Sequence, residues 1–389
     1  MRHQNSVFHG LLKHVPWSFF DRLVDEHKGD SGVRRLTTKS QFVALLYGQL
    51  SGASSLREIE LGLRSHACGL YHLGAHEVQR STLADANALR PHAIFTRLFT
   101  RMALAGSRGL RRATTDAVRL IDATSVRLAG VAGEWARLSK GVQGAKAHIV
   151  YDPDAATPVY LEVTPARVND IVVAKRMPIE PGASYVFDLG YYDFAWWAEL
   201  DAKGCRIVTR LKVNTPLRPI EERAVPDGSG LAYDRVGLLP ARLAGARKNP
   251  LPKPVREIGV RLDGPKASQD RVLRVFSNDL DAPASEIAAL YKRRWAIELF
   301  FRWVKQTLRI KHFVGRSENA VRIQIAVALI AYILLKMAHE AAGLVQSTLA
   351  FARLIRANLM QKRPINQLLN PKHRPPLDTG QIAFQWNAT

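Results

Sequence analysis

The amino-acid sequence predicts a mixed α/β fold, on three observations. Five short β-rich runs follow one another between residues 117 and 211. Helical periodicity precedes them up to about residue 110 and returns at residue 285. The intervening residues 212–284 are rich in Pro, Gly, Arg and Lys and contain further strand-like runs. We therefore expect a central sheet flanked by helices and interrupted by a mainly β insertion.

The composition is that of a globular protein with an unusual charge. The 389 residues are 47% hydrophobic and 23% charged, which is ordinary for a chain of two or three domains. Lys and Arg number 56 against 34 Asp and Glu, so the formal net charge is +22. This excess favours a polyanionic partner, because release of counterions from phosphates drives binding. Ribosome-associated proteins and Arg-favouring GC-rich genes give the same excess, so charge alone does not assign an enzyme.

Cysteine content and hydropathy predict a cytoplasmic protein. Cys68 and Cys205 are too few for a disulfide framework or a zinc site, and we expect both to be buried. The first residues lack the apolar region of a secretory signal. The most hydrophobic run, residues 323–335, is shorter than the roughly 20 residues that a bilayer requires. We expect it to be a buried core helix, with no membrane partner.

Residues 1–110 are predicted to form a helical N-terminal domain. A helix over residues 38–50, a short turn and a second helix over residues 55–63 have the dimensions of a helix-turn-helix. Plain helical hairpins share this pattern and are commoner, so DNA reading by this segment is one of two open interpretations. A third helix is expected to begin near Ser81 and to continue through Phe99.

The five β-rich runs belong to the first part of a core domain, residues 111–211. They are Ala117–Ala123, Lys146–Tyr151, Pro158–Val163, Tyr185–Asp188 and Cys205–Leu211. Short connections between the first three suit an antiparallel meander, whereas helical segments separate the last three. After the insertion, residues 285–389 complete the core and form a helical C-terminal region, with Ser285 as the expected cap of the first helix.

Two aspartates end predicted strands, and a glutamate lies on the helix after the insertion. Asp122 follows an apolar run, as does Asp188, so both carboxylates are expected at the rim of the sheet, where sites form. Each aspartate alone is more often a turn or helix cap. Glu298 among basic residues is more often the partner of an arginine one turn away. The three together are harder to explain as structural residues.

The helix that bears Glu298 carries a regularly spaced set of polar residues. Tyr291, Arg294, Glu298 and Lys305 are separated by 3, 4 and 7 positions, so they recur on one helical face. Two cations and a carboxylate therefore converge there.

These residues carry a specific resemblance to a known family. The segments IDATS and YVFDLGYYD and the pattern Y-x2-R-x3-E-x6-K resemble the DDE transposases of the insertion sequence 4 family. The resemblance spans most of the chain, because that family has a helical DNA-binding region, a ribonuclease-H-like core with a mixed five-stranded sheet, and a β-rich insertion before the helix with the last carboxylate. It implies a transposase that cleaves DNA at element ends and transfers the strand into target DNA.

The resemblance also implies a role for each matching residue. Asp122, Asp188 and Glu298 match the three catalytic carboxylates, and Tyr291 and Arg294 match phosphate contacts, as does Lys305 further along the helix. Three hard oxygen ligands suit Mg2+, with Mn2+ as a substitute, in a two-metal-ion phosphoryl transfer. The expected partners are the terminal inverted repeats and target DNA, bound by a homodimer in a synaptic complex associated with the nucleoid.

Some family members cut through a DNA hairpin and stack a flipped base on tryptophans. Trp295, beside the motif arginine, matches the first such position. The second has no match, because Tyr233 and Phe276 are the only aromatic residues between Lys212 and Tyr291. The sequence therefore leaves the hairpin pathway open.

Two other classes of protein compete with the transposase. A ribonuclease-H-like nuclease would share the carboxylates and metals but would need neither the helical N-terminal region nor the insertion. A non-catalytic DNA-binding protein would need only the charge and the helical hairpin, with the three acids as structural residues. Dependence on metal separates the second class from an enzyme.

Overall fold

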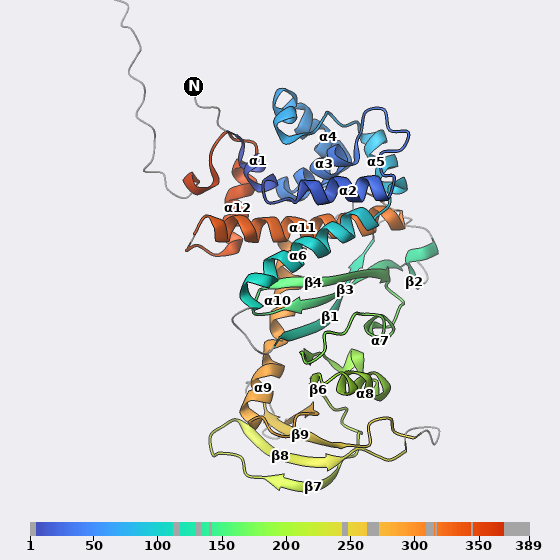
Figure 1. Ribbon diagram of the computed structural model, residues 1–389, viewed down its shortest axis with the longest axis vertical. Coiled ribbons are helices and arrows are strands. Elements are labelled where there is room, and N and C mark those ends of the chain that lie inside the picture. The colour runs from blue at the N-terminus through green and yellow to red at the C-terminus, as the bar shows by residue number, and fades with distance from the viewer. Residues whose placement is uncertain are drawn as a thin grey trace, which may run out of the picture.

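Three layers follow one another along the long axis of the molecule: helices from both ends of the chain, a mixed sheet, and the strands of the insertion (Figure 1). The computed structural model describes residues 5–111, 117–128, 134–139, 142–242, 248–262, 272–308, 315, 317–343 and 345–368.

The N-terminal region is helical, as the sequence predicts. Its elements are α1 (Val7–Leu12), α2 (Trp17–Glu26), α3 (Thr38–Ser51), α4 (Leu56–Arg64), η1 (Ala67–Leu73), α5 (Arg80–Leu89) and α6 (Ala93–Arg111). The predicted hairpin is present as α3 and α4. The single helix expected from Ser81 to Phe99 is wrong, because the helix ends before Pro91. Its N-cap is Gln79 and not Ser81, and the Gln79 side chain makes no capping hydrogen bond. A proline disfavours helical backbone in the residue before it, which ends α5.

Each of the five predicted runs forms a strand: β1 (Val118–Arg127), β3 (Val142–Asp152), β4 (Thr157–Pro165), β5 (Ser184–Val186) and β6 (Arg206–Arg210). They lie in the order β4-β3-β1-β5-β6, with β1 antiparallel to β3 and parallel to β5. The short β2 (Arg137–Ser139) pairs with β3. Between the strands lie η2 (Glu134–Ala136), α7 (Asp170–Ala174), η3 (Leu189–Tyr191) and α8 (Phe194–Ala202).

The insertion forms an antiparallel set of strands: β7 (Arg218–Arg223), β8 (Leu231–Leu238), β9 (Pro254–Arg261) and β10 (Val272–Ser277). Because β10 pairs with β6, these strands continue the central sheet, which has ten strands in the described residues. The sheet is thus larger than the five strands that the sequence predicts.

The C-terminal region contains α9 (Ala284–Arg293), α10 (Trp295–Thr307), α11 (Glu318–Ala341), α12 (Thr348–Asn358) and η5 (Ile365–Gln367). Two expectations for its first helix are wrong. Pro283, not Ser285, stands at its N-cap. The helix is also interrupted at Arg294, where the amides of Arg294 and Ile297 bond to carbonyls three residues back, at 3.1 and 3.2 Å. Such tighter turns are typical of helix ends.

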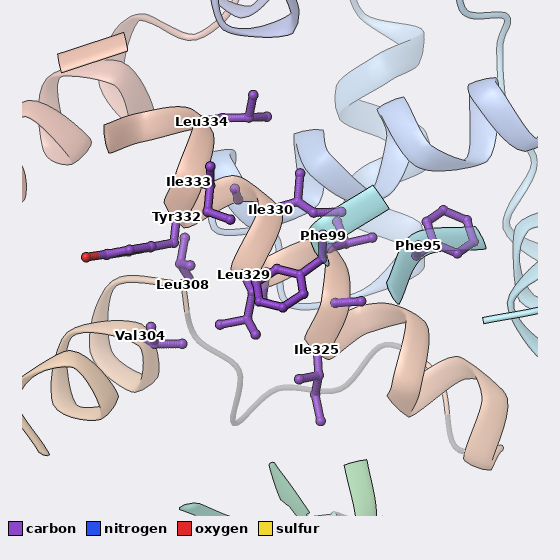
Figure 2. Packing of buried hydrophobic residues seen from close by; sticks show 14 of the residues in the cluster. Phe95, Phe99, Val304, Leu308, Ile325, Leu329, Ile330, Tyr332, Ile333 and Leu334 are labelled. Carbon is purple, nitrogen blue, oxygen red and sulfur yellow. The ribbon is translucent and has the colours of Figure 1, made fainter. Parts of the chain in front are cut away.

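The main core lies where α11 packs on α6 and α10 (Figure 2). Phe99, Leu329 and Ile330 meet there, each at most 1% exposed. One described helix, α11, is long and apolar enough to cross a membrane, but 83% of its apolar window is buried inside the protein. It is a core helix, as predicted for residues 323–335. Of the two cysteines only Cys205 is buried; the prediction for Cys68 is wrong, because it lies exposed on η1.

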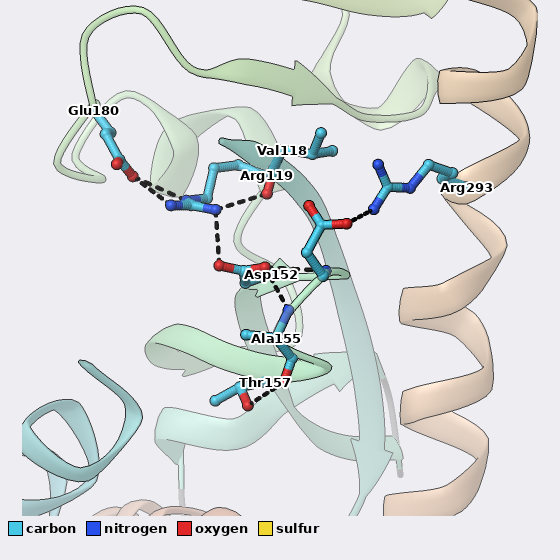
Figure 3. Close-up of polar contacts among 8 residues, drawn as sticks. Val118, Arg119, Asp152, Ala155, Thr157, Glu180 and Arg293 are labelled. Atoms are coloured by element: carbon cyan, nitrogen blue, oxygen red, sulfur yellow. Dashed lines mark hydrogen bonds and ion pairs between the residues drawn. The ribbon is translucent and has the colours of Figure 1, made fainter. Parts of the chain in front are cut away.

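A buried arginine ties the start of β1 to its neighbours (Figure 3). Arg119, 3% exposed at its side chain, donates from Nη1 to Asp152 at 3.1 Å and from Nε to Glu180 at 2.9 Å. The turn after Asp152 also contacts α9, because Asp154 forms an ion pair with Arg293 at the end of that helix. Through the turn at residues 152–154, these contacts link β1 to α9.

Candidate active site

Asp122 lies within β1, opposite Ile149 of β3, and faces α10. Its Oδ1 accepts a hydrogen bond from the amide of Ala123 at 2.8 Å, and its side chain is 20% exposed. The carboxylate therefore stands on the sheet, accessible and partly desolvated. β1 continues for five residues beyond it, so Asp122 is not the last residue of the strand.

Asp188 follows β5, the parallel neighbour of β1. It caps η3 through Oδ1, which accepts from the amide of Gly190 at 2.8 Å. The structural role expected for a lone aspartate is thus real, but it occupies one carboxylate oxygen. A Cβ at position 190 would lie 3.0 Å from that oxygen and 3.4 Å from Oδ2 of Asp170, so glycine keeps this turn narrow.

Glu298 is brought to the same place by α10. Its Oε1 lies 2.6 Å from Nη2 of Arg294, and Nη1 of Arg294 lies 4.0 Å from Oδ2 of Asp122. The i,i+4 ion pair that competes with a catalytic role therefore exists, and its guanidinium lies between two of the three acids. The Nε of Arg294 is buried and has no hydrogen-bond partner among the residues that the structure describes.

Three further predicted residues lie on the same pair of helices, α9 and α10. Tyr291 lies one turn before Arg294, with the Arg294 guanidinium 5.9 Å from the centre of the tyrosine ring. Trp295 is 61% exposed beside the site. Lys305 lies further along α10 and faces Thr124 and Val126 of β1 across a cavity of about 10 Å³. Thus α10 runs along β1 with Lys305 opposite the strand, whereas Tyr291 stands near the end of α9 and Trp295 faces the solvent.

The charges of Asp188 and Glu298 act on Asp122. The pKa of Asp122 is raised from 3.8 to about 6, first by burial and then by the negative charges of Asp188 and Glu298. The hydrogen bond from Ala123 and the charge of Arg294 oppose this rise. Three acids from β1, the β5 turn and α10 therefore share one electrostatic environment, which is where a cation is stabilised.

The donor set fits a hard divalent cation by its chemistry, since all three candidate ligands are carboxylates. In the described ranges, however, no three carboxylate, imidazole or thiol groups already stand together as a metal-binding group. The Arg294 guanidinium engages Glu298 instead. A metal ion would therefore share the Glu298 carboxylate with this arginine or displace it.

Sequence reasoning missed Arg210, which ends β6 next to Asp188. Its charge acts on Tyr291, and its buried Nε has no hydrogen-bond partner in the described part of the chain. Together with Arg294 it offers a second guanidinium with unused donor capacity, as a phosphate site requires. The pattern that indicated the aspartates does not indicate Arg210, because the predicted run continues to Leu211 and the strand ends at Arg210 only in the structure.

Tyr191 was also missed. Its side chain is 1% exposed, and its hydroxyl has no hydrogen-bond partner within the described residues. Burial raises its pKa well above 10, and the charges of Asp122, Asp170 and Asp188 add to the rise. The tyrosine therefore closes the site from the α7 side. No spacing pattern in the sequence indicates this position.

Residues that sequence reasoning excluded from the site lie in the core. His148 is fully buried and bonds Thr164 through Nε2 at 2.8 Å, and Trp196 and Trp197 are at most 1% exposed. Of the two aromatic residues of the insertion, Phe276 is buried and Tyr233 donates its hydroxyl to Glu257 at 2.7 Å. Neither stands free as a partner for Trp295.

Comparison with known proteins identifies the family of this chain. The transposase DDE domain family matches residues 113–334, and a domain of unknown function (DUF4372) matches residues 3–76. The "Putative transposase y4zB" of Sinorhizobium fredii is 39% identical over 76% of this chain and 82% of its own length. The "Probable transposase for insertion sequence element IS5377" of Geobacillus stearothermophilus is 27% identical over 67% of each chain.

Among solved structures, a piggyBac transposase in a synaptic complex with hairpin DNA covers 97% of this chain and 84% of its own, with a TM-score of 0.46 and 13% identity. The family match spans more than half of the 389 residues and includes all three carboxylates. Members of the family act on DNA and use divalent metal ions. The chain therefore belongs to the transposase DDE domain family and is a transposase of the insertion-sequence type.

Proposed function

We propose that this transposase belongs to the insertion sequence 4 family and that Asp122, Asp188 and Glu298 are its catalytic carboxylates, the ligands of Mg2+ or of Mn2+ in its place. One observation carries the proposal: the guanidinium of Arg294 lies 2.6 Å from Glu298 and 4.0 Å from Asp122, and Asp188 follows the strand that pairs in parallel with that of Asp122. Separate structural roles would not require the three acids to come from β1, the turn after β5 and the helix that faces β1.

The strand order supports a ribonuclease-H-like core as part of this proposal. An antiparallel meander, β1-β3-β4, is followed by two strands parallel to β1, in the order β4-β3-β1-β5-β6. Asp122 and Asp188 then come from neighbouring parallel strands, which is the usual place for a site in such a sheet.

Bound divalent ions would stabilise the charge on the attacking and leaving oxygens during phosphoryl transfer. The chain's own residues position the DNA. Arg294 releases Glu298 and turns its guanidinium, including the buried Nε, to a phosphate next to the scissile bond. Lys305 contacts a second phosphate as a point charge, and Tyr291 donates its hydroxyl to a third oxygen. Trp295, exposed at the edge, stacks on an unpaired base.

The same site performs cleavage and joining, with water as the first nucleophile and a 3'-hydroxyl as the second. We propose that a homodimer holds two element ends in a synaptic complex, in the cytoplasm on nucleoid DNA. The resemblance of the motifs supports this assembly, and the net charge of +22 supports the polyanionic partner.

The test is cleavage of a labelled duplex that carries the element end, with Mg2+ or with a chelator. Wild type is compared with Asp122→Asn and Glu298→Gln. The matched control is Glu318→Gln, because Glu318 forms an equivalent i,i+4 pair with Arg322 at 2.6 Å and is 43% exposed, against 39% for Glu298.

We expect metal-dependent nicking to fall about a hundredfold or more in the two site variants and to persist in the control, with DNA binding retained throughout. Equal cutting by all variants would remove catalysis from these carboxylates. Joining of the cut end to a plasmid target then separates a transposase from a nuclease, which yields nicks and no joined product.

A further inference from the structure

Helix α5 stands out on the surface of the N-terminal region. Only Leu83, Ala86 and Asn87 of its ten residues are buried. The exposed ones are Arg80, Ser81, Thr82, Ala84, Asp85, Ala88 and Leu89. Most of these side chains are short, so another backbone can approach the helix closely. Leu89 is 82% exposed, which is unusual for a leucine beside charged residues.

A basic hollow adjoins this face. Its volume is about 670 Å³, and α5 lines it with Thr82, Asp85 and Leu89 among others. The opposite wall is the segment 28–36, which contributes the exposed cations Lys28, Arg34 and Arg35. These three side chains form no ion pair or hydrogen bond with any residue that the structure describes. Three exposed cations against one exposed carboxylate, Asp85, leave the hollow basic, which favours a polyanion.

The approach to α5 also suits insertion into a groove. The short helix η1 precedes it, Gly74 turns the chain with a φ of 65°, and the buried Ala75 and Val78 anchor the connection. A helix, a glycine turn and a projecting second helix are the parts of a helix-turn-helix. The predicted reading hairpin suits DNA less well, because α3 is buried on nearly all sides and α4 exposes Glu58 between Arg57 and Arg64.

We propose that α5 reads the terminal repeat of the element in the major groove of duplex DNA, while Lys28, Arg34 and Arg35 contact the adjacent phosphates. This rests on the proposed function, which supplies the DNA. The major groove admits one α-helix, and Ser81, Thr82 and the methyl groups of Leu89 can meet base edges and thymine methyls. The reading helix lies in the helical layer, separated from the sheet by α6 and α11 (Figure 1).

The test is equilibrium binding without metal, so it does not depend on catalysis. The probes are a duplex with the element end, taken from the DNA that flanks the coding sequence, and a duplex of scrambled sequence. The variants are Thr82→Ala with Leu89→Ala on α5, Arg34→Ala with Arg35→Ala on the loop, and Arg57→Ala with Leu61→Ala on the exposed face of α4 as the matched control. All six positions are exposed, and thermal melting verifies folding.

We expect the α5 variant to bind the element end about tenfold more weakly and to keep its affinity for the scrambled duplex. The loop variant should bind both duplexes more weakly, and its plot of log affinity against log salt should be shallower by about two, one for each lost phosphate contact. The α4 control should match wild type. The proposal would be overturned if the α4 variant lost its preference for the element end. It would also be overturned if the α5 variant kept that preference.

The outcome is independent of the catalytic assignment. Asp122→Asn should retain the full preference for the element end, because the carboxylate takes no part in binding by α5. If cleavage fails to depend on the carboxylates but α5 still sets selectivity, only the catalytic proposal falls. If substitutions on α5 leave the preference for the element end unchanged while cleavage depends on the acids, only the proposal for α5 is refuted.

Discussion

Arg294 and Glu298 form an ion pair across one turn of α10, with Nη2 and Oε1 2.6 Å apart, at the point where the helix is interrupted. The same guanidinium lies 4.0 Å from Asp122. The arginine thus lies against two of the acids proposed as metal ligands. Its guanidinium and a bound metal ion would compete for the carboxylates of Glu298 and Asp122.

This competition predicts opposite effects of Arg294→Ala on metal and on DNA. The variant should bind Mn2+ more tightly in calorimetry without DNA, because Glu298 is released. Its cleavage of the element end should nevertheless fall about a hundredfold, because the phosphate contact is lost. Arg293→Ala is the control, since Arg293 pairs with Asp154 and not with the acids. Unchanged Mn2+ affinity would show that the ion pair does not compete.

The turn that carries Asp188 should tolerate no side chain at position 190. In Gly190→Ala the new Cβ would lie 3.0 Å from Oδ1 of Asp188 and would push that carboxylate from its place. Cleavage should fall about ten- to a hundredfold while the melting temperature changes little. Gly69→Ala is the control, because a Cβ there meets nothing within 4 Å. Equal activity of the two variants would contradict this reading of the turn.

Loss of Arg119 should destabilise the whole core. Arg119→Met leaves Asp152, whose side chain is 5% exposed, as a buried charge without its partner. We expect a loss of about 3–5 kcal/mol in the free energy of unfolding, measured by urea denaturation. The double variant with Asp152→Asn should recover part of this loss, because the unpaired charge is then removed. A double variant no more stable than Arg119→Met would refute this explanation.

His148 should make stability depend on pH. Burial lowers its pKa from 6.5 to about 4, against the charge of Asp170 and with that of Lys146 and Arg176. Below pH 6.5 the unfolded chain takes up a proton that the folded chain excludes, so stability falls as the pH drops from 6.5 towards 4. The difference amounts to about 3 kcal/mol. In urea titrations across this range His148→Gln should lose that much less stability than wild type. Parallel curves would show that His148 is not the group responsible.

The sequence by itself determined the local features of this protein. Short apolar, β-rich runs located the strands that precede Asp122 and Asp188, and helical spacing placed Arg294 one turn from Glu298. These features depend on residues that are close together in the sequence, so they can be predicted from it directly. The net charge of +22 likewise predicted a polyanionic partner without any fold.

Only the tertiary structure decided which distant residues meet. The pairing of β10 with β6 joins the insertion to the sheet, and packing on α11 leaves α5 projecting while α3 is covered. Tyr191 reaches the site through the turn after β5, and Arg210 through the pairing of β6 with β5. Such contacts depend on loop closure and burial across the whole chain, and no periodicity in the sequence encodes them.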